Sequence, residues 1–256
     1  PLSTDLSIMR QSLIFSGLET LAFNINRQQS DLKLFEFGKT YHDFDDQKEE
    51  FNHLSILITG NKTEKRWNSK KTEVGYFYLK GLVTGIFDRL GIKKFKSLPL
   101  SNDIFSEGQQ LSVGKHSLVE FGSLKTNALT TFGISQNVFC ANFNWNNLLK
   151  VINQNTIKFK DISKYPEVKR DLSLLIDEDI TFEKLYKLAK QSENNYLKDI
   201  NLFDVYRGDK LENGKKSYSI SFTLQDNKQT LKDSQIDKIM SKIQKRFESE
   251  LGAELR

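Results

Sequence analysis

Residues 216–225 read KSYSISFTLQ, and this stretch decides the fold of the second half of the chain. Tyr218, Ile220, Phe222 and Leu224 alternate with small hydroxyl residues. Because successive side chains of a β-strand point to opposite faces, the alternation predicts a strand with one apolar face and one small polar face. A sheet of such strands buries one side and leaves the other open, so helices must cover the apolar side.

The segments on both sides of this stretch predict the other elements of a small α+β domain. Alternation of apolar and polar residues assigns the strands, and apolar residues spaced three and four apart assign the helices. In chain order they are a strand at 172–176, a helix at 181–189, strands at 200–206 and 216–225, a helix at 236–251 and an edge strand at 253–256. Thr230 or Asp233 can cap the last helix, which Gly252 ends. The resulting order is β-α-β-β-α-β.

The first 160 residues predict a separate α+β domain with an antiparallel sheet. Its expected elements are a helix at 7–26, strands at 32–37 and 54–59, a helix at 76–90 and several strands joined by tight turns within 109–145. Pro166 pushes Tyr165 out of the α region and marks a connection. We therefore place the domain boundary near residue 160, with domains at 1–160 and 161–256.

The composition is that of a folded globular protein, with 38% hydrophobic and 28% charged residues among 256. No apolar stretch approaches the ~20 residues of a membrane helix, so the sequence excludes a membrane-spanning helix and predicts no membrane partner. The chain starts at Pro1 without a secretory signal, so we expect it to be a piece of a longer protein. Cys140 is the single cysteine, which rules out an internal disulfide and favours the cytoplasm. Its apolar neighbours predict a buried residue without chemistry.

The net charge of +5 fits a nucleic-acid partner without demanding one. Residues 1–161 carry 20 basic and 16 acidic residues, and residues 162–256 carry 18 and 17. The basic excess is therefore not concentrated in the C-terminal domain, and charge alone does not identify the partner.

The residue types of common catalytic and metal sites lack the required spacing. His42, His53 and His116 are far apart, which predicts no metal site. The acidic cluster at 43–50 lacks the glycine turn of a calcium loop. No phosphate-binding loop, nucleophile elbow or dinucleotide fingerprint occurs, and the Gly81–Gly85 pair indicates close helix packing. Trp67 and Trp145 could anchor a subunit interface or pack within the domain. We predict no catalytic residue and no metal.

Several short motifs of the C-terminal domain occur in a fixed order. They are YPEVKRDLSL at 165–174, LFDVYRG at 202–208, GKKS at 214–217, QTL at 229–231 and GAELR at 252–256. In this order and spacing, over residues 163–256, they resemble the ferredoxin-fold anticodon-binding domain of phenylalanyl-tRNA synthetase β subunits. The resemblance implies a ferredoxin-like fold that binds the anticodon stem-loop of tRNA(Phe), with no DNA partner.

The first domain resembles the catalytic-like region that precedes this module in the same subunits. The matching motifs are PLS at 1–3, MRQSL at 9–13, LFEFG at 34–38 and YFYLKGL at 76–82. The resemblance implies a class II synthetase-like antiparallel sheet with flanking helices, in the C-terminal part of a β subunit. It also implies a catalytic α subunit as partner, in an α2β2 ligase that attaches phenylalanine to tRNA(Phe).

The features of a working class II site are missing from the sequence. Such a site needs an arginine on a sheet strand and a glycine-rich segment ending in arginine to meet phosphate charge. Residues 35–37 read FEF, and no such glycine-rich run exists. We therefore expect this chain to be catalytically inactive and to bind no cofactor itself, whereas the resemblance implies ATP and Mg²⁺ for the whole enzyme.

Basic residues of the second domain are the candidates for tRNA contacts, because cations contact phosphate while polar and aromatic groups contact bases. They are Lys169, Arg170, Arg207, Lys215, Lys216, Lys228 and Arg256. Each could instead be solvated or paired with an acidic neighbour such as Asp171, Asp204 or Asp209. Arg170 and Asp171 in particular could form a pair that holds the fold. The alternative function is a regulatory or oligomerisation module that binds a small metabolite, because this fold alone does not fix function.

Overall fold

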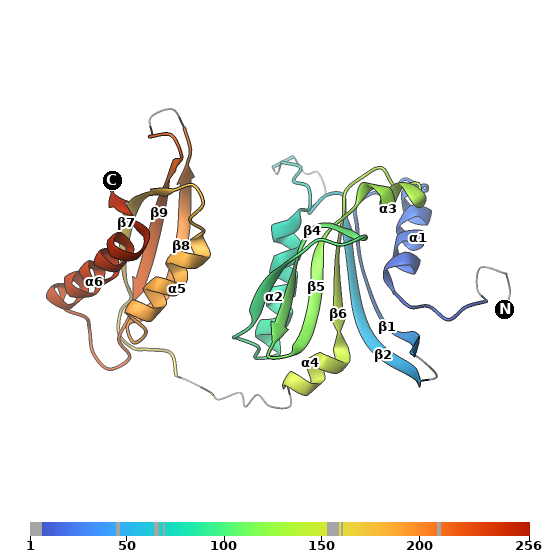
Figure 1. The fold of residues 1–256 in the computed structure, drawn as a ribbon, viewed down its shortest axis with the longest axis horizontal. Helices are drawn as coiled ribbons and strands as arrows, with labels where there is room; N and C mark the ends of the chain where they lie inside the picture. Colours follow the sequence, from blue (N-terminus) through green and yellow to red (C-terminus); the bar gives the residue numbers. More distant parts are fainter. Residues whose placement is uncertain are drawn as a thin grey trace. The chain divides into compact units, whose positions relative to one another are not determined.

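The computed structural model describes residues 7–44, 47–63, 67–68, 70–152, 159, 161–208 and 211–256. The motif at residues 1–3 and the residues Asp45, Asp46 and Asp209 lie outside this part. The chain divides into two compact units, Pro1–Lys158 and Phe159–Arg256, which are treated separately (Figure 1). Within the described part, no helix is long and apolar enough to cross a membrane.

The first unit is built on a six-stranded antiparallel sheet with the order β1-β2-β6-β5-β4-β3. Its strands are β1 Leu32–Phe44, β2 Gln47–Thr59, β3 Lys96–Leu100, β4 Phe105–Val113, β5 His116–Leu124 and β6 Val138–Asn144. Alternating side chains of β2 and β6 enter two different apolar clusters, so both faces of the sheet are buried there.

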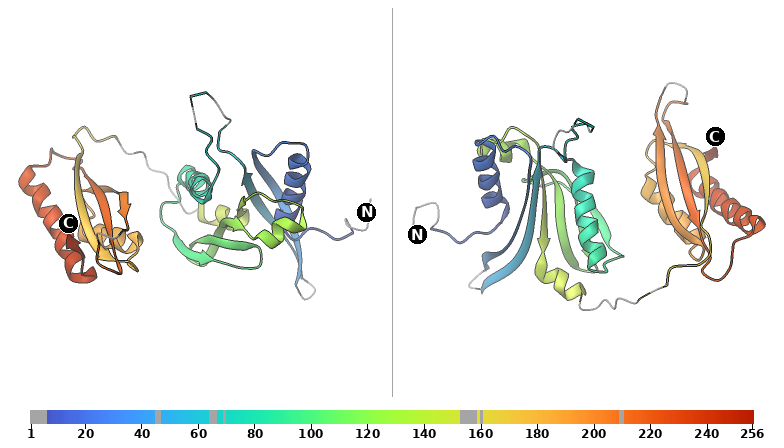
Figure 2. Two further views of the ribbon diagram at one scale, coloured as in Figure 1. Left: turned by 90° about the horizontal axis from the view of Figure 1, so that it is seen from above. Right: turned by 180° about the vertical axis from the view of Figure 1, so that it is seen from behind.

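Helices cover both faces of this sheet. On one face, α1 (Ile14–Ile25) and α3 (Thr126–Thr131) pack against a cluster that includes Leu57 and Cys140. On the other face, α2 (Tyr76–Arg89) and α4 (Trp145–Ile152) pack against a cluster that includes Ile58 and Phe143. The view from above shows α1 and α2 on opposite sides of the sheet (Figure 2). The expected antiparallel sheet with flanking helices is confirmed.

The first unit differs from the sequence prediction at its start and its end. Helix α1 begins at Ile14 instead of residue 7, because the segment before it runs beside β1. The Tyr41 N–H donates to the Arg10 carbonyl at 3.0 Å, and Arg10 Nε donates to the Lys39 carbonyl at 3.0 Å. These two contacts of Arg10, one through its backbone and one through its side chain, hold the segment along β1 in place of the first helical turns. The helix α3 also interrupts residues 109–145, which the sequence predicted as strands only.

The second unit has a four-stranded antiparallel sheet with the order β10-β7-β9-β8. Its elements are β7 Val168–Asp177, α5 Phe182–Ser192, β8 Leu197–Tyr206, β9 Lys215–Leu224, α6 Asp233–Leu251 and β10 Glu254–Leu255. The first strand of this unit lies between its fourth and third strands, which is the arrangement of a ferredoxin-like βαββαβ domain. The predicted α+β fold is therefore confirmed here.

Both helices of the second unit cover the same face of its sheet. Ile220 and Phe222 of β9 are buried against Leu185 of α5 and against Ile243 and Phe247 of α6. The hydroxyl residues that alternate with them lie on the opposite face, and no helix of the described part covers that face. The KSYSISFTLQ alternation thus produces one covered face and one open face, as predicted.

The ends of α6 are fixed by local backbone contacts. Its N-cap is Lys232, and the Gln235 side chain accepts the Lys232 N–H at 3.0 Å, so neither Thr230 nor Asp233 is the cap. Gly252 adopts φ 61° at the C-terminal end, a left-handed conformation that glycine tolerates without strain. The turn leads directly into β10, which completes the sheet.

Candidate nucleic-acid interface

The open face of the second unit contains a polar hollow, which we call the sheet hollow. Three strands and the residue that follows β10 contribute its lining. The lining residues are Ser173 of β7, Asp204 and Tyr206 of β8, Ser217 and Ser219 of β9, and Arg256.

A β-bulge places the two β8 residues in the sheet hollow. Leu202 pairs with Ile220 on the covered face, but Asp204 pairs with Ser219 and Tyr206 with Ser217 on the open face. In a regular strand, residues 202, 204 and 206 would all point the same way. The extra residue Phe203 changes the phase of the strand, as bulges do. Without the bulge, Asp204 and Tyr206 would point into the apolar core.

Arg256 and Tyr206 form the two large walls of the sheet hollow. The guanidinium carbon of Arg256 lies 5.4 Å from the centre of the Tyr206 ring, within the range of a cation–π contact. The Arg256 N–H donates to the Ser173 carbonyl at 3.0 Å, which fixes the end of the chain to β7. A Cβ on Gly208 would lie 2.8 Å from the Tyr206 hydroxyl, so a side chain there would displace the ring.

The groups in the sheet hollow suit the edge and face of a nucleobase. Aromatic rings and guanidinium planes stack on unpaired bases, and hydroxyls donate or accept at base edges. The Asp204 carboxylate can accept hydrogen bonds from amino and imino groups of a base. A carboxylate in the lining disfavours a phosphate, which carries the same sign of charge.

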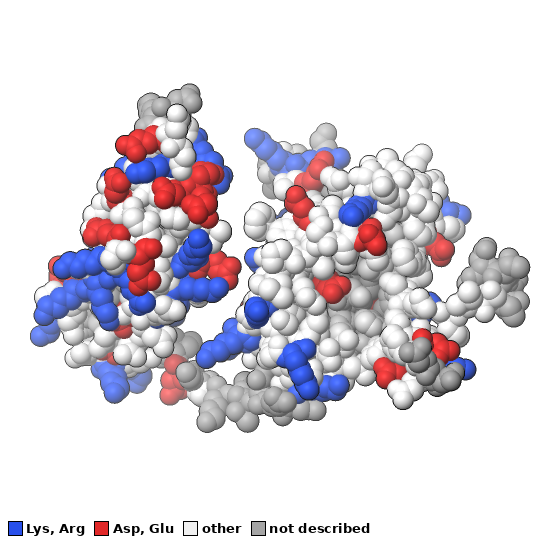
Figure 3. Space-filling model, in the orientation of Figure 1, with Lys and Arg blue, Asp and Glu red and all other residues white. Residues whose placement is uncertain are grey.

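The open face carries mixed charge. Its acidic residues, by register with the polar side of β9, are Asp171, Asp177, Asp199, Asp204 and Glu254. Its basic residues are Lys169, Lys215 and Arg256. Basic side chains gather instead over the helices of this unit, where Lys238, Lys242 and Lys245 of α6 are exposed (Figure 3). The open face is therefore arranged for selective contacts more than for general attraction of phosphate.

Three of the seven predicted tRNA-contact residues lie on this open face. Arg256 lines the sheet hollow. Lys215 lies on β9, two residues before the lining residue Ser217. Lys215 Nζ bonds to the Glu254 carboxylate at 2.9 Å, and hydrogen bonds to Glu254 and then Glu212 raise the Lys215 pKa. Lys169 is exposed further along β7, opposite Thr223. These three residues stay candidates for RNA contact.

Two of the predicted contact residues lie on the side of the helices. Lys216 is only 3% exposed, and its Nζ donates to the Glu178 carbonyl at 2.7 Å. A phosphate on the surface cannot reach this buried ammonium, so Lys216 is a structural residue. Arg170 forms an ion pair with Asp233 at 3.5 Å and not with its neighbour Asp171, because adjacent strand residues point to opposite faces.

The remaining two predicted residues lie at the ends of strands. Arg207 follows β8 and forms an exposed ion pair with Glu178 at 2.7 Å. Lys228 is exposed in the loop between β9 and α6, where its backbone N–H donates to Asp226. Neither lines the sheet hollow. Sequence reasoning in turn missed Asp204 and Tyr206, although the apolar phase of β8 changes from Leu202 to Val205 and so signals the bulge.

The first unit has a polar row on the face that carries α1. Directly opposed residues of five strands form it, namely Glu36, Ser55, Asn142, Glu120 and Gln110. Arg10 bonds to Glu36 at 2.6 Å and is the only cation of the described part in an ion pair with this row. Burial raises the pKa of Glu120. Two carboxylates against one paired arginine do not fit a triphosphate, which needs several cations.

The other residues singled out from the sequence have ordinary environments. Cys140 is fully buried, and burial raises the pKa of its thiol to about 12. Trp145 packs its ring against Phe37, with centroids 4.9 Å apart. Trp67 is 99% exposed. The Trp145 side chain therefore takes part in packing within the unit.

A helix-backed antiparallel sheet whose open face presents an aromatic ring, hydroxyls and a few cations is a surface that small RNA-binding modules use to stack bases. Residues 163–256 match the family model described as "Ferredoxin-fold anticodon binding domain". Residues 1–145 match the model described as "Phenylalanyl tRNA synthetase beta chain CLM domain". The chain belongs to the phenylalanyl-tRNA synthetase β chain family.

Curated relatives agree with this membership. The chain is 43% identical over 269 residues to the phenylalanine–tRNA ligase β subunit of Bacteroides fragilis, covering 100% of this chain and 33% of that protein. It is 42% identical over 268 residues to the same subunit of Bacteroides thetaiotaomicron, and 35% over 263 residues to that of Fusobacterium nucleatum, with the same coverage. The chain thus spans about a third of the length of these relatives.

Proposed function

We propose that this chain is part of the β subunit of a phenylalanine–tRNA ligase, and that its sheet hollow receives an unpaired base of the anticodon loop of tRNA(Phe). The observation that carries the proposal is the bulge of β8, which turns Asp204 and Tyr206 to the open face beside Arg256. The base stacks on the Tyr206 ring and the Asp204 carboxylate accepts its N–H groups. The matched anticodon-binding family model supports this assignment.

The first unit acts in this proposal as a non-catalytic scaffold. It assembles with a catalytic α subunit into an α2β2 enzyme of the cytoplasm. ATP and Mg²⁺ bind to the α subunit. The names of the relatives as β subunits support the α partner. The polar row with Glu36 and Glu120, which does not fit a triphosphate, supports a first unit without ATP chemistry.

The test is binding of tRNA(Phe) to the full chain across a salt series. The described part of the open face carries Lys169, Lys215 and Arg256, so we expect about two or three phosphate contacts. Log Kd should then rise against log salt with a slope of about 2, since each contact on a single strand contributes about 0.7. No binding at low salt, or saturable binding of a small metabolite alone, would overturn the proposal in favour of a regulatory module.

Substitutions in the sheet hollow locate the binding face. Tyr206→Ala should weaken binding by about 1–3 kcal/mol, the contribution of one base stacked on an aromatic ring. Tyr186→Ala is the matched control, because Tyr186 is a partly exposed tyrosine on α5. Lys215→Glu should also weaken binding and make the slope with salt shallower. Equal affinities of the Tyr206 and Tyr186 variants would place the contact elsewhere, such as on the basic side of α6.

A further inference from the structure

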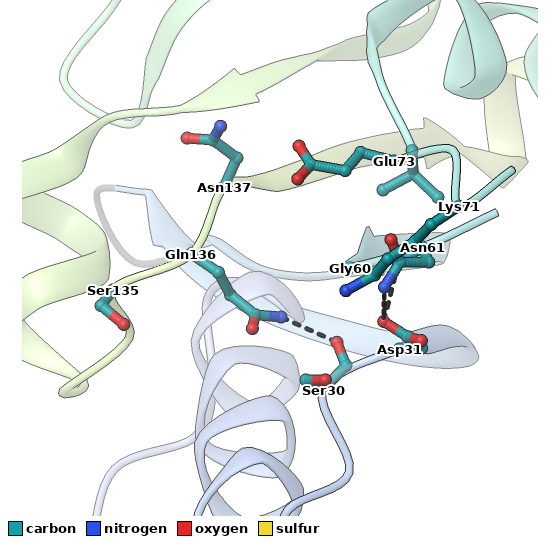
Figure 4. A pocket seen from close by; sticks show the side chains of 10 residues that line it. Ser30, Asp31, Gly60, Asn61, Lys71, Glu73, Ser135, Gln136 and Asn137 are labelled. Atoms are coloured by element: carbon teal, nitrogen blue, oxygen red, sulfur yellow. Dashed lines mark hydrogen bonds between the residues drawn. The ribbon is translucent and has the colours of Figure 1, made fainter. Parts of the chain in front are cut away.

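The first unit contains a polar cavity that none of the roles above uses. It lies where the turn before β1, the end of β2, the segment before α2 and the loop before β6 meet (Figure 4). Its volume is ≈ 290 Å³, compared with about 30 Å³ for one water molecule in the liquid. The cavity therefore has room for a small organic molecule.

One wall of the cavity holds a buried acceptor without a partner. Asn61 is 7% exposed, and its Nδ2 donates to Asp31 Oδ1 at 2.6 Å. Because the amide nitrogen faces a carboxylate, the orientation of the amide is settled, and Oδ1 is the atom left over. This Asn61 Oδ1 is buried and has no hydrogen-bond partner among the residues that the structure describes, and Asn61 lines the cavity. Leaving such an atom unpaired is unfavourable, and a donor in the cavity would remove that cost.

The other walls carry further acceptors beside the hydroxyls of Ser30 and Ser135 and the amide of Asn137. Glu73 reaches over the cavity from the side opposite Asp31 (Figure 4). Gln136 donates its Nε2 to the Ser30 carbonyl at 2.8 Å and to Thr59 Oγ1 at 2.7 Å, so its donors are already used inside the wall. Lys71 is the cation among the lining residues. Among the described lining residues, two carboxylates against one ammonium give a net negative charge.

The backbone holds this arrangement in place. Gly60 has φ 78°, and a Cβ there would lie 2.3 Å from the Ser30 carbonyl oxygen and 2.4 Å from Asp31 Oδ1. The Val74 N–H donates to the Gly60 carbonyl at 2.9 Å, and Asn61 pairs with Glu73 as an isolated β-bridge. The acceptors are thus presented by paired backbone, which lowers the entropy cost of binding a ligand.

From these observations we infer that the cavity binds a small organic cation through an ammonium or guanidinium group. The N–H donors of the cation bond to Asn61 Oδ1 and to the carboxylates of Asp31 and Glu73. The two carboxylates disfavour an anion, and a neutral ligand would leave the net charge uncompensated. Lys71 competes with the ligand for the same carboxylates, so its charge limits the affinity.

Titration of the full chain with agmatine, followed by calorimetry at low salt, tests the inference. Agmatine carries both an ammonium and a guanidinium group, whereas choline is a cation of similar size without N–H donors. We expect saturable binding of agmatine and at least about tenfold weaker binding of choline. No binding of agmatine up to about 10 mM, or equal binding of both cations, would overturn the inference.

Two substitutions with opposite signs separate a ligand site from a structural cluster. Glu73→Gln should weaken agmatine about tenfold, and Lys71→Ala should tighten it about threefold, because one removes an attractive charge and the other a competing charge. Glu107→Gln is the matched control, since Glu107 is exposed on β4 and does not line the cavity. Unchanged affinity in both cavity variants would contradict the site, even with unchanged thermal stability.

Discussion

The two sheets of this chain are both antiparallel, yet they use their faces differently. The six-stranded sheet has helices on both faces, with α1 and α3 on one side and α2 and α4 on the other. The four-stranded sheet has α5 and α6 on the same face. A sheet covered twice buries its side chains and serves packing, whereas a sheet covered once keeps a polar face for a ligand. The position of two helices thus decides which sheet keeps an open polar face.

The covered face of the four-stranded sheet should show the largest effect of substitution. Phe222→Ala removes a fully buried ring that packs against Phe247, with centroids 6.4 Å apart, and should cost about 3–5 kcal/mol of unfolding free energy. The neighbouring Ser221→Ala lies on the open face and should change it by less than about 0.5 kcal/mol. Urea unfolding followed by circular dichroism measures both. Similar losses in the two variants would contradict the assignment of faces.

Thiol reactivity compares the two sheets directly. Cys140 of the six-stranded sheet has a thiol pKa of about 12, because it is fully buried. A cysteine introduced by Ser219→Cys would lie on the open face with ordinary access to solvent. At pH 8 the difference in thiolate fraction predicts about thousandfold faster alkylation of the introduced cysteine. Mass spectrometry of iodoacetamide-treated peptides gives the two rates, and comparable rates would mean that both sites are equally accessible.

Two adjacent lysines of β9 sharpen the contrast between faces. Lys216 is buried and donates to the Glu178 carbonyl, so Lys216→Ala should cost about 1–3 kcal/mol by leaving that carbonyl unpaired. Lys215 forms ion pairs at the open face, and Lys215→Ala should leave the stability almost unchanged while it weakens tRNA binding. Unfolding and binding measurements on both variants check this. The reverse pattern would place Lys216 on the RNA side.

The smallest expected effect concerns the pH dependence of the first unit. Burial lowers the pKa of His53 from its usual 6.5. The unfolded chain therefore takes up a proton more readily than the folded chain, and stability decreases as the pH falls below 6.5 towards the folded-state pKa. His53→Gln should reduce this decrease between pH 7.5 and about pH 5.5. The midpoints of urea unfolding at the two pH values, for the original chain and the variant, measure this decrease. An equal decrease in both proteins would exclude His53 as its source.

Some features of the interface could be predicted from the sequence, and others could not. The alternation from Tyr218 to Leu224 correctly predicted a covered face and a polar face. The same alternation also places Lys216 on the covered face, and its burial argues against the predicted RNA contact. The pairing of Arg170 with Asp233 could not be predicted, because the two residues are 63 positions apart and meet only when α6 packs on the sheet.

The sequence by itself determined the local elements of both units, the apolar side of each strand and helix, and through its ordered motifs the family. These properties depend on residues within a few positions of each other, where periodicity is visible. Only the tertiary structure decided the sheet hollow around Tyr206 and the cavity around Asn61. Each of these depends on the register between strands or on loops distant in sequence, which long-range packing sets and local patterns do not encode.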